Sequence, residues 1–336
     1  MHHNLKTTAE YFLSCDWGTS SLRLKLVDCK DGTVLAEQRS AQGIAETFNL
    51  WQETGGQNNE RKAAFYLSII GRHIEKIEEK VRFSLGGIKL IISGMASSSL
   101  GFIDIPYNDI PLNIDGSALK TAQIAASNDF SHDVLVISGV RTSDDVMRGE
   151  ETQLIGCIDP GQTVKNELFI FPGTHSKHIS VKDNHVAGFK TFMTGEFFEL
   201  LSQKSILKNS VESNSGSESI NDLMVFKDGV KTAVSENLLH SVFTVRMNHL
   251  FNKLSPQENF NYLSGLLIGA EMQDLAASDA GTINLLCGPN LAVYYQTALR
   301  ELIPTKNVKT FPAEWVDGAA ARGHHKIGCQ LKIFHE

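Results

Sequence analysis

The chain has 336 residues, 42% of them hydrophobic and 21% charged, which is typical of a folded protein with one large domain or two smaller ones. Its formal net charge of −7 excludes a globally basic surface of the kind that binds nucleic acid or an anionic membrane. The five cysteines form no Cys-x-x-Cys pair, and no apolar run reaches the ~18 residues of a membrane span. We therefore expect a cytoplasmic protein with reduced thiols and with neither a nucleic-acid nor a membrane partner.

The first half of the sequence alternates between strand and helix patterns. Leu22, Leu24 and Leu26 fall on one face of a half-buried strand, and the turn residues that follow lead into a returning strand. Continuous apolar runs further along suit a sheet that helices cover on both faces. The predicted elements are strands at 11–16, 21–28 and 33–40, a helix at 61–82, and strands at 88–93 and 133–138.

The second half repeats the opening pattern of the first. Gly173-Thr174 follows a buried strand as Gly18-Thr19 does, and an ungapped alignment of the two glycines pairs Arg23 with His178. Similarity at about half-chain spacing predicts duplicated α/β domains at 1–160 and 161–336 that face each other, the alternative being chance similarity between two hairpins. The second half is predicted to contain strands at 167–171 and 177–182, an exposed flexible loop at 212–221, a helix at 259–277, a strand at 282–287 and a helix at 291–302.

Both Gly-Thr loops carry groups that can bind phosphate. A turn of Gly, Thr and Ser after a buried strand exposes N–H and hydroxyl donors, and glycine lets a phosphate approach the backbone closely. Arg23 follows the first loop and Lys177 lies at the end of the second, so each loop has a cation beside it. Two such loops can bind the phosphates of one nucleotide, whereas either loop alone is equally compatible with an ordinary tight hairpin.

Asp16 precedes the first loop, and the second loop has no acid at the corresponding position. A carboxylate beside bound phosphates is repelled unless a cation lies between them. Asp16 therefore predicts Mg²⁺, held largely through water. One metal position is enough for one pair of phosphates, which explains a single acid across two loops.

Carboxylates gather around Arg148, where Asp145, Glu150 and Glu151 follow the strand at 133–138. Acidic residues stabilise a helix N-terminus, so a capped, solvated helix start is one interpretation. The other is a catalytic base, because phosphoryl transfer to an alcohol needs a carboxylate that orients the hydroxyl and accepts its proton. The spacing leaves both interpretations open.

A Ser-rich segment, residues 93–102, follows the strand at 88–93. Ligands of α/β sheets bind at the carboxyl ends of strands. A loop of hydroxyl groups there suits a polyhydroxylated ligand, although Ser-rich turns also occur without one.

Six segments form a specific pattern when they are read in order: DWGTSSLR, SGMASSSLG, DVMRGEETQLIG, FPGTHSKH, FMTGE and YLSGLLIGAE. Together they resemble the 2-dehydro-3-deoxygalactonokinase family of the actin-like ATPase superfamily, over about Phe12 to Ala321. The resemblance implies two duplicated actin-like, ribonuclease H-like domains with a nucleotide cleft between them. The first would carry one phosphate loop and the sugar-acid site, and the second the other phosphate loop and the adenosine site.

The resemblance also implies roles for individual residues. Asp16 would lie beside the metal, and the base would be Glu150 or Glu151, then Asp145. Arg148 is our own inference for the substrate carboxylate, which suits a guanidinium fork. The phosphates would be bound by Gly18, Thr19, Ser20, Ser21, Arg23, Gly173, Thr174, His175, Ser176 and Lys177, the adenosine by Gly288, Pro289 and Asn290, and the sugar acid by Met95, Ala96, Ser97 and Ser98, with Thr194, Gly195 and Glu196 as a further part of the cleft.

The implied reaction is phosphorylation of the C6 hydroxyl of 2-dehydro-3-deoxy-D-galactonate by ATP and Mg²⁺. Its product, the 6-phosphate, would be taken by an aldolase in D-galactonate breakdown. Two alternatives stay open: a kinase for another keto-deoxy sugar acid such as 2-dehydro-3-deoxygluconate, and a non-catalytic ATP-binding sensor with the same fold. A homodimer is compatible with the sequence.

Overall fold

The computed structural model describes residues 10–55, 59–213 and 220–334, so part of the predicted loop at 212–221 lies outside the described residues. The chain divides into two compact units. Unit 1 comprises the residues up to 163 together with 184–187 and 317–336, and unit 2 comprises 164–183 and 188–316. The predicted division into 1–160 and 161–336 differs from this chiefly at the C-terminus, because the last helix packs within unit 1.

The main sheet of unit 1 runs in the order β3-β2-β1-β4-β8-β7. Strand β1 pairs antiparallel with β2 and parallel with β4, and β4 pairs parallel with β8. The predicted antiparallel opening and the predicted buried strands are therefore confirmed. The strands are β1 (Tyr11–Trp17), β2 (Leu22–Asp28), β3 (Val34–Ser40), β4 (Lys89–Gly94), β7 (Thr121–Ile124) and β8 (Val134–Ile137).

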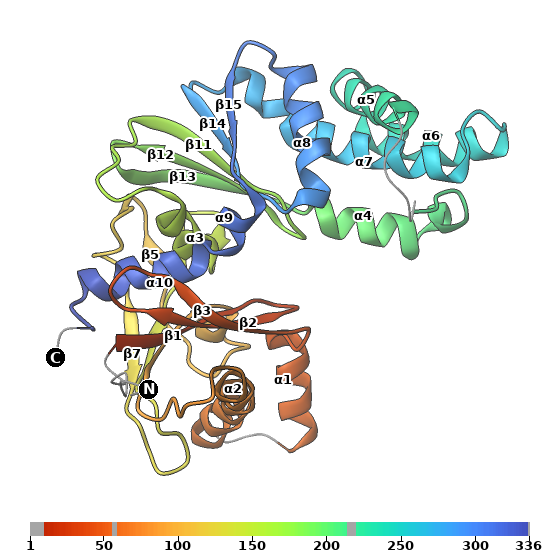
Figure 1. Ribbon diagram of the computed structural model, residues 1–336. Coiled ribbons are helices and arrows are strands. Elements are labelled where there is room, and N and C mark those ends of the chain that lie inside the picture. Colours follow the sequence, from red (N-terminus) through yellow and green to blue (C-terminus); the bar gives the residue numbers. More distant parts are fainter. Residues whose placement is uncertain (1–9, 56–58, 214–219, 335–336) are drawn as a thin grey trace. The chain divides into compact units, whose positions relative to one another are not determined.

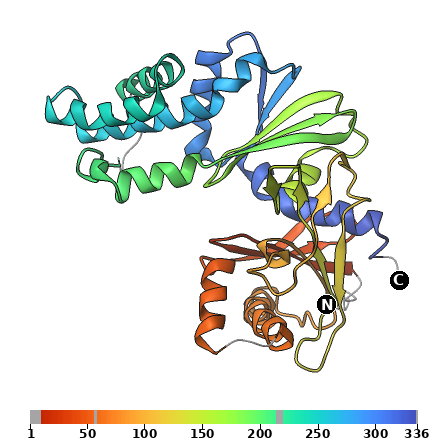
Figure 2. The same cartoon turned by 180° about the vertical axis from the view of Figure 1, so that it is seen from behind.

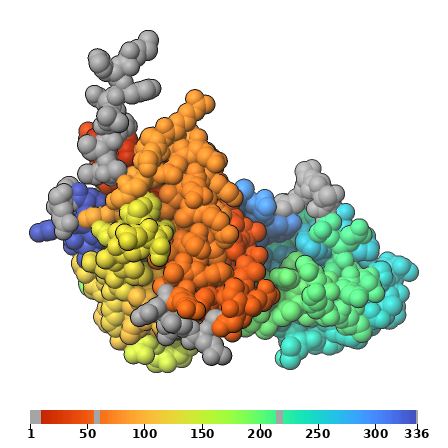
Figure 3. All heavy atoms as spheres, turned by 90° about the horizontal axis from the view of Figure 1, so that it is seen from below, coloured from red at the N-terminus to blue at the C-terminus, as the bar shows by residue number. Residues whose placement is uncertain are grey.

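Helices cover both faces of this sheet (Figure 1). On one face Trp17 packs against Tyr66 of α2, and α1 and α2 form much of the outer surface seen in orange in Figure 3. On the other face α10 packs against β1, where Ser14 Oγ lies 2.7 Å from His324 Nδ1. The helices are α1 (Ile44–Glu53), which the sequence analysis missed, α2 (Asn59–Val81) and α10 (Ala319–Gln330).

Short elements connect the main sheet of unit 1 to helix α3 (Glu150–Cys157), which packs against α10. Arg322 Nε donates to Gly156 O at 2.9 Å, and Lys326 Nζ donates to Ile155 O at 2.8 Å. Cations at the C-terminal end of a helix interact favourably with its dipole, so α10 stabilises α3. The connecting elements are η2 (Met95–Ser97), β5 (Asn108–Asp109), β6 (Leu112–Asn113), β9 (Val140–Arg141), β10 (Val146–Met147) and α3 (Glu150–Cys157).

The sheet of unit 2 runs in the order β15-β14-β11-β12-β13. Strand β11 pairs antiparallel with β12 and parallel with β14, and β14 pairs parallel with β15. This is the order of β8-β4-β1-β2-β3 in unit 1, so the predicted duplication is confirmed at the level of topology. The strands are β11 (Asn166–Phe171), β12 (Ser176–Lys182), β13 (His185–Phe192), β14 (Thr282–Leu285) and β15 (Asn307–Thr310).

The helices of unit 2 pack against its sheet and against one another (Figure 2, green to blue). Phe226 of α5 and Ile268 of α7 share a buried cluster with Ile170 of β11. Helix α7 begins with a capping box, in which Ser255 and Glu258 bond each other's backbone N–H groups. The helices are α4 (Thr194–Gln203), η3 (Ile206–Asn209), α5 (Ile220–Ser235), α6 (Leu238–Leu250), α7 (Pro256–Met272), η4 (Gln273–Ala277), α8 (Pro289–Leu302) and α9 (Ala313–Asp317).

The two loop-bearing hairpins differ by one residue. In unit 1 Asp16 pairs with Arg23, and in unit 2 Phe171 pairs with Lys177. The ungapped pairing of Arg23 with His178 is therefore wrong on the second strand. The second loop is one residue shorter than the first, and Lys177 takes the place of Arg23. Each hairpin thus carries one cation at the same ladder position.

No helix among the described residues is both long enough and apolar enough to cross a membrane.

Candidate active site

The first Gly-Thr loop joins β1 to β2 and is held by the start of α1. Gly18 N–H donates to Ser21 O at 2.9 Å, and Gly18 O accepts from Ile44 N–H at 3.0 Å. Thr19 and Ser20 are exposed, and within the described part of the chain their backbone N–H groups have no protein acceptor. The loop therefore presents hydroxyl and amide donors on a fixed backbone, as phosphate binding requires.

Asp16 lies at the end of β1, beside the start of α3. Its Oδ2 is 3.7 Å from an Arg23 guanidinium nitrogen and accepts from Gln153 Nε2 at 3.5 Å. Burial raises the pKa of Asp16; the Arg23 charge works against this rise, and the nearby Glu150 carboxylate adds to it. A Cβ on Gly149 would lie 3.8 Å from Asp16 Oδ1. Asp16 and Glu150 are thus near enough at the carboxyl end of β1 for their charges to interact.

The three candidate bases have different surroundings. Glu150 is half-buried near Asp16. Glu151 is 1% exposed, and its carboxyl accepts from Gly149 N–H at 2.8 Å. Burial, followed by the Glu150 charge, raises the pKa of Glu151 to about 8. Asp145 accepts from Val146 N–H at 2.7 Å, in the turn between β9 and β10. Each of the three has a local partner, because Glu150 also accepts from Arg148 N–H at 3.1 Å, and Glu150 is the one whose charge acts on Asp16.

Arg148 is largely enclosed by the segment that follows η2. Its guanidinium donates to Ser97 Oγ at 2.7 Å and to Ile105 O at 3.2 Å, and it stacks on the Tyr107 ring with 4.0 Å to the centroid. Its side chain is 5% exposed. In this conformation Arg148 fixes the chain between Ser97 and Tyr107, and its contact with a substrate carboxylate stays a prediction.

The predicted sugar-contacting turn follows β4 at the same edge of the sheet as Asp16. Ala96, Ser97 and Ser98 are buried, and Met95 is half-buried. Ser98 Oγ donates to Met95 O at 2.7 Å, and Ser97 Oγ donates to Gly94 O at 3.3 Å. The two hydroxyls therefore act as donors within the turn.

The second Gly-Thr loop joins β11 to β12 and is held by the start of α4. Thr174 and His175 are exposed. Glu196 N–H donates to Thr174 O at 3.1 Å, and His175 Nε2 lies 2.6 Å from Glu196 Oε2. Glu196 therefore contacts the second loop, next to the residues predicted to bind phosphate.

Ser176 and Lys177, which were also predicted to contact phosphate, are buried. Ser176 Oγ donates to the Glu271 carboxylate at 2.6 Å, and Thr194 Oγ1 donates to the same carboxylate at 2.5 Å. The sequence analysis missed Glu271. The sequence does mark this residue, because it is an acidic residue within the apolar run of α7.

A glycine lets each helix start approach its loop. A Cβ on Gly43 would lie 2.1 Å from Thr19 O, and a Cβ on Gly195 would lie 2.6 Å from Gly173 O. Such distances leave no room for a larger residue. Gly195 was predicted as a cleft residue, and its equivalent Gly43 was missed.

The predicted adenosine motif lies at the start of α8. Gly288 is the N-cap, Pro289 is the first helical residue, and both are exposed together with Asn290. The motif follows β14, so it too lies beyond the carboxyl end of a strand.

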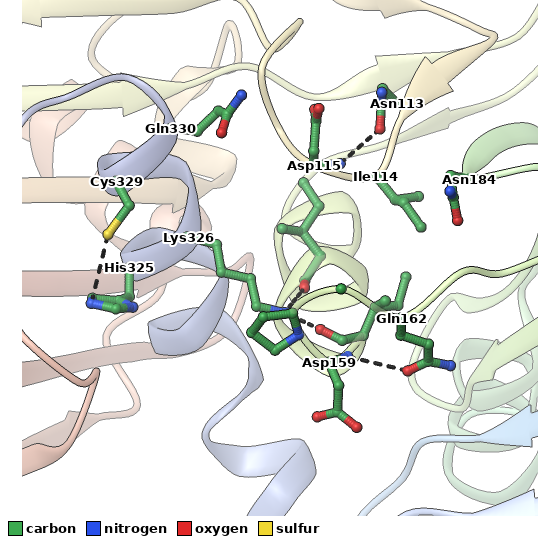
Figure 4. A pocket seen from close by; sticks show the side chains of 14 residues that line it. Asn113, Ile114, Asp115, Asp159, Gln162, Asn184, His325, Lys326, Cys329 and Gln330 are labelled. Atoms are coloured by element: carbon green, nitrogen blue, oxygen red, sulfur yellow. Dashed lines mark hydrogen bonds between the residues drawn. The ribbon is translucent and has the colours of Figure 1, made fainter.

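A separate pocket in unit 1 lies among β6, the end of α3 and α10 (Figure 4). Lys326 and His325 line it, and Lys326 points at the backbone of α3, whose carbonyls accept its bonds. None of the predicted site residues lines this pocket. Asn113 and Gln162 accept from backbone N–H groups of their own turns.

The strand order and the paired Gly-Thr loops define an α/β protein of two actin-like ATPase units. An activator of the 2-hydroxyisocaproyl-CoA dehydratase from Clostridium difficile with bound ADPNP shares this fold, with a TM-score of 0.50, 11% identity and 96% of each chain covered. A putative 2-dehydro-3-deoxygalactonokinase from Sinorhizobium meliloti is more similar, with a TM-score of 0.76, 28% identity and 96% of each chain covered.

Residues 16–321 match the family model of the 2-keto-3-deoxy-galactonokinases, and the chain belongs to this kinase family. A probable 2-dehydro-3-deoxygalactonokinase from Rhizobium meliloti is 33% identical over 87% of this chain and 90% of its own length. The 2-dehydro-3-deoxygalactonokinase of Escherichia coli is 28% identical over 88% of this chain and 91% of its own length.

Proposed function

We propose that this protein transfers the γ-phosphoryl group of ATP to the C6 hydroxyl of 2-dehydro-3-deoxy-D-galactonate. The match to a kinase family over residues 16–321 carries this proposal. The relatives that cover most of the chain bear the name of this activity. The chemistry of the residues around Asp16 supports it.

The two Gly-Thr loops bind the phosphates of ATP in this proposal. Thr19 and Ser20 offer exposed hydroxyls, and Arg23 adds a cation beside Asp16. Thr174 and His175 are the exposed residues of the second loop. Adenosine binds near Gly288 at the start of α8.

Asp16 holds Mg²⁺ in this proposal. A Mg²⁺ ion is usually bound by one or two carboxylates, waters and substrate phosphates rather than by a cage of protein ligands. The described residues fit this pattern, because Asp16 has Glu150 nearby and no cluster of three or more His, Cys, Asp or Glu side chains surrounds them. When bound, the ion would neutralise charge on the phosphates.

Glu150 is the base in this proposal. It accepts the C6 hydroxyl proton while the hydroxyl oxygen bonds to the γ-phosphorus and the bond to ADP breaks. Its half-buried position near Asp16 favours it over Glu151, which is 1% exposed. We expect Glu150→Gln to lower kcat by about 10²- to 10⁴-fold, the usual contribution of a general base. Asp145→Asn is the matched control and should keep most of its activity.

An acceptor panel tests the substrate. ADP release is measured with 2-dehydro-3-deoxygalactonate and with 2-dehydro-3-deoxygluconate, its C4 epimer. A higher kcat/KM for the first acid supports the proposal. A preference for the epimer would reassign the substrate, because such discrimination depends on a few hydroxyl partners.

A further inference from the structure

Glu271 of α7 is a buried carboxylate with four side-chain partners on different parts of unit 2. Its Oε1 accepts from Ser176 Oγ at 2.6 Å and lies 2.9 Å from His178 Nε2. Its Oε2 accepts from Thr194 Oγ1 at 2.5 Å and from Tyr295 OH at 2.8 Å. A carboxylate offers about four lone-pair sites, so all of its accepting capacity is used.

The carboxylate stays ionised although it is 3% exposed. Burial raises the pKa of Glu271, but the bonds from His178, Ser176 and Thr194 outweigh this and lower it overall. Losing the carboxylate would leave several buried donors unpaired, which is costly. The Glu271 carboxylate therefore holds its four partner side chains in fixed positions relative to one another.

These partners surround the second Gly-Thr loop. Ser176 directly follows the exposed residues Thr174 and His175. Thr194 begins α4, whose next residue, Gly195, packs against the loop backbone. Tyr295 lies in α8, one and a half turns after the exposed start of that helix. Glu271 thus connects the second loop, the helix that holds it, and the helix that begins at the predicted adenosine motif.

Unit 1 fills the same place with apolar side chains. The ladder pair Cys15–Leu24 corresponds to Ile170–His178, because Asp16–Arg23 corresponds to Phe171–Lys177. Leu24 is fully buried in the core of unit 1. Apolar packing is thus sufficient to stabilise this hairpin, and replacing a buried polar network by apolar residues is often neutral or stabilising. A hairpin of this kind therefore does not require such a network for its stability.

We propose that Glu271 is a positioning residue for nucleotide binding, which holds the second Gly-Thr loop in register with α4 and α8. The inference rests on the proposed function for the identity of the nucleotide. It does not depend on the sugar acid.

Glu271→Gln tests this role, because the amide keeps the size of the side chain but has one accepting oxygen instead of two. ADP binding is measured by calorimetry, and the KM values for ATP and sugar acid by steady-state kinetics. We expect the Kd for ADP and the KM for ATP to rise about 10-fold, as for the loss of one or two bonds to a charged group, with the acceptor KM within about twofold. Thr194→Val removes one donor and should shift the same two constants in the same direction by less.

Asn259→Ala is the matched control. Asn259 lies buried in the same helix and bonds Ser210 O and Val245 O, away from the loop. It should lower the melting temperature without moving the Kd for ADP. The inference is overturned if folded Glu271→Gln binds ADP within twofold of the unmodified protein, or if Asn259→Ala weakens ADP binding equally. A protein that binds ADP but phosphorylates no sugar acid would refute the proposed function. The comparison of ADP binding between Glu271→Gln and the unmodified protein would still test the role of Glu271.

Discussion

Function and stability oppose each other at Asp16. The side chain is 14% exposed, and burial and the Glu150 charge raise its pKa. A raised carboxyl pKa means that the ionised form costs stability above the ordinary pKa and costs nothing below it. A buried acid kept under these conditions is typical of functional sites.

Asp16→Asn should therefore abolish most turnover while raising the melting temperature at neutral pH. The gain should shrink as the pH falls towards the ordinary range of an aspartate, because the carboxyl is then protonated in both the folded and unfolded states. Thermal unfolding between pH 4 and 8, together with an activity assay, checks this. Full activity in the variant would refute the metal-side role of Asp16.

Glu151 predicts a second pH dependence. Its pKa is raised to about 8, so the folded protein keeps a proton that the unfolded chain loses above its ordinary pKa near 4.5. Stability should therefore fall as the pH rises from about 4.5 to 8 and level off above that. Glu151→Gln keeps an acceptor for Gly149 N–H and should remove much of this fall. Melting curves from pH 5 to 9 would contradict the prediction if the two proteins had parallel profiles.

At the residue scale, the position of Asp16 near the end of β1 could be predicted, because an apolar run precedes it and the turn residue Gly18 follows it. Its role beside a metal stays a prediction. The base could not be assigned. Glu150 and Glu151 are neighbours in the first turn of α3, and only the packing of that helix in the folded chain makes Glu150 half-buried and Glu151 1% exposed.

At the element scale, each Gly-Thr loop is held by the start of a helix. The approach is close enough that a Cβ on Gly195 would lie 2.6 Å from Gly173 O. Gly195→Ala should displace the second loop and raise the KM for ATP by about 10-fold, the effect of roughly 1.4 kcal/mol. Gly188→Ala is the control, since no atom lies within 4 Å of its Cβ. Equal KM values for ATP in the two variants would contradict the prediction that this contact positions the second loop.

Eight strands and the helices α2, α7 and α8 were predicted because their apolar patterns are strong, whereas β13, α5 and α6 are among the elements that were missed. Helix α1 was missed: only Ile44, Thr47 and Trp51 are buried in it, and its start is fixed by a contact with the first loop. The one-residue difference between the hairpins was also missed. An ungapped alignment assumes equal loop lengths, and the true register is set by strand pairing.

At the scale of the whole molecule, the half-chain similarity predicted the duplication, and the structure adds the common strand order of the two sheets. It did not predict the return of residues 317–336 to unit 1. That return depends on long-range packing of α10 against β1, such as the bond between Ser14 and His324. The duplication therefore accounts for the two Gly-Thr loops but not for the position of the C-terminal helix.

The most direct test measures ADP release with and without 2-dehydro-3-deoxygalactonate and identifies the product by phosphorus NMR. We predict acceptor-dependent turnover, with a phosphate ester at C6 and little hydrolysis of ATP in the absence of the acid. Binding of ATP without acceptor-dependent turnover would contradict the account and indicate a nucleotide sensor.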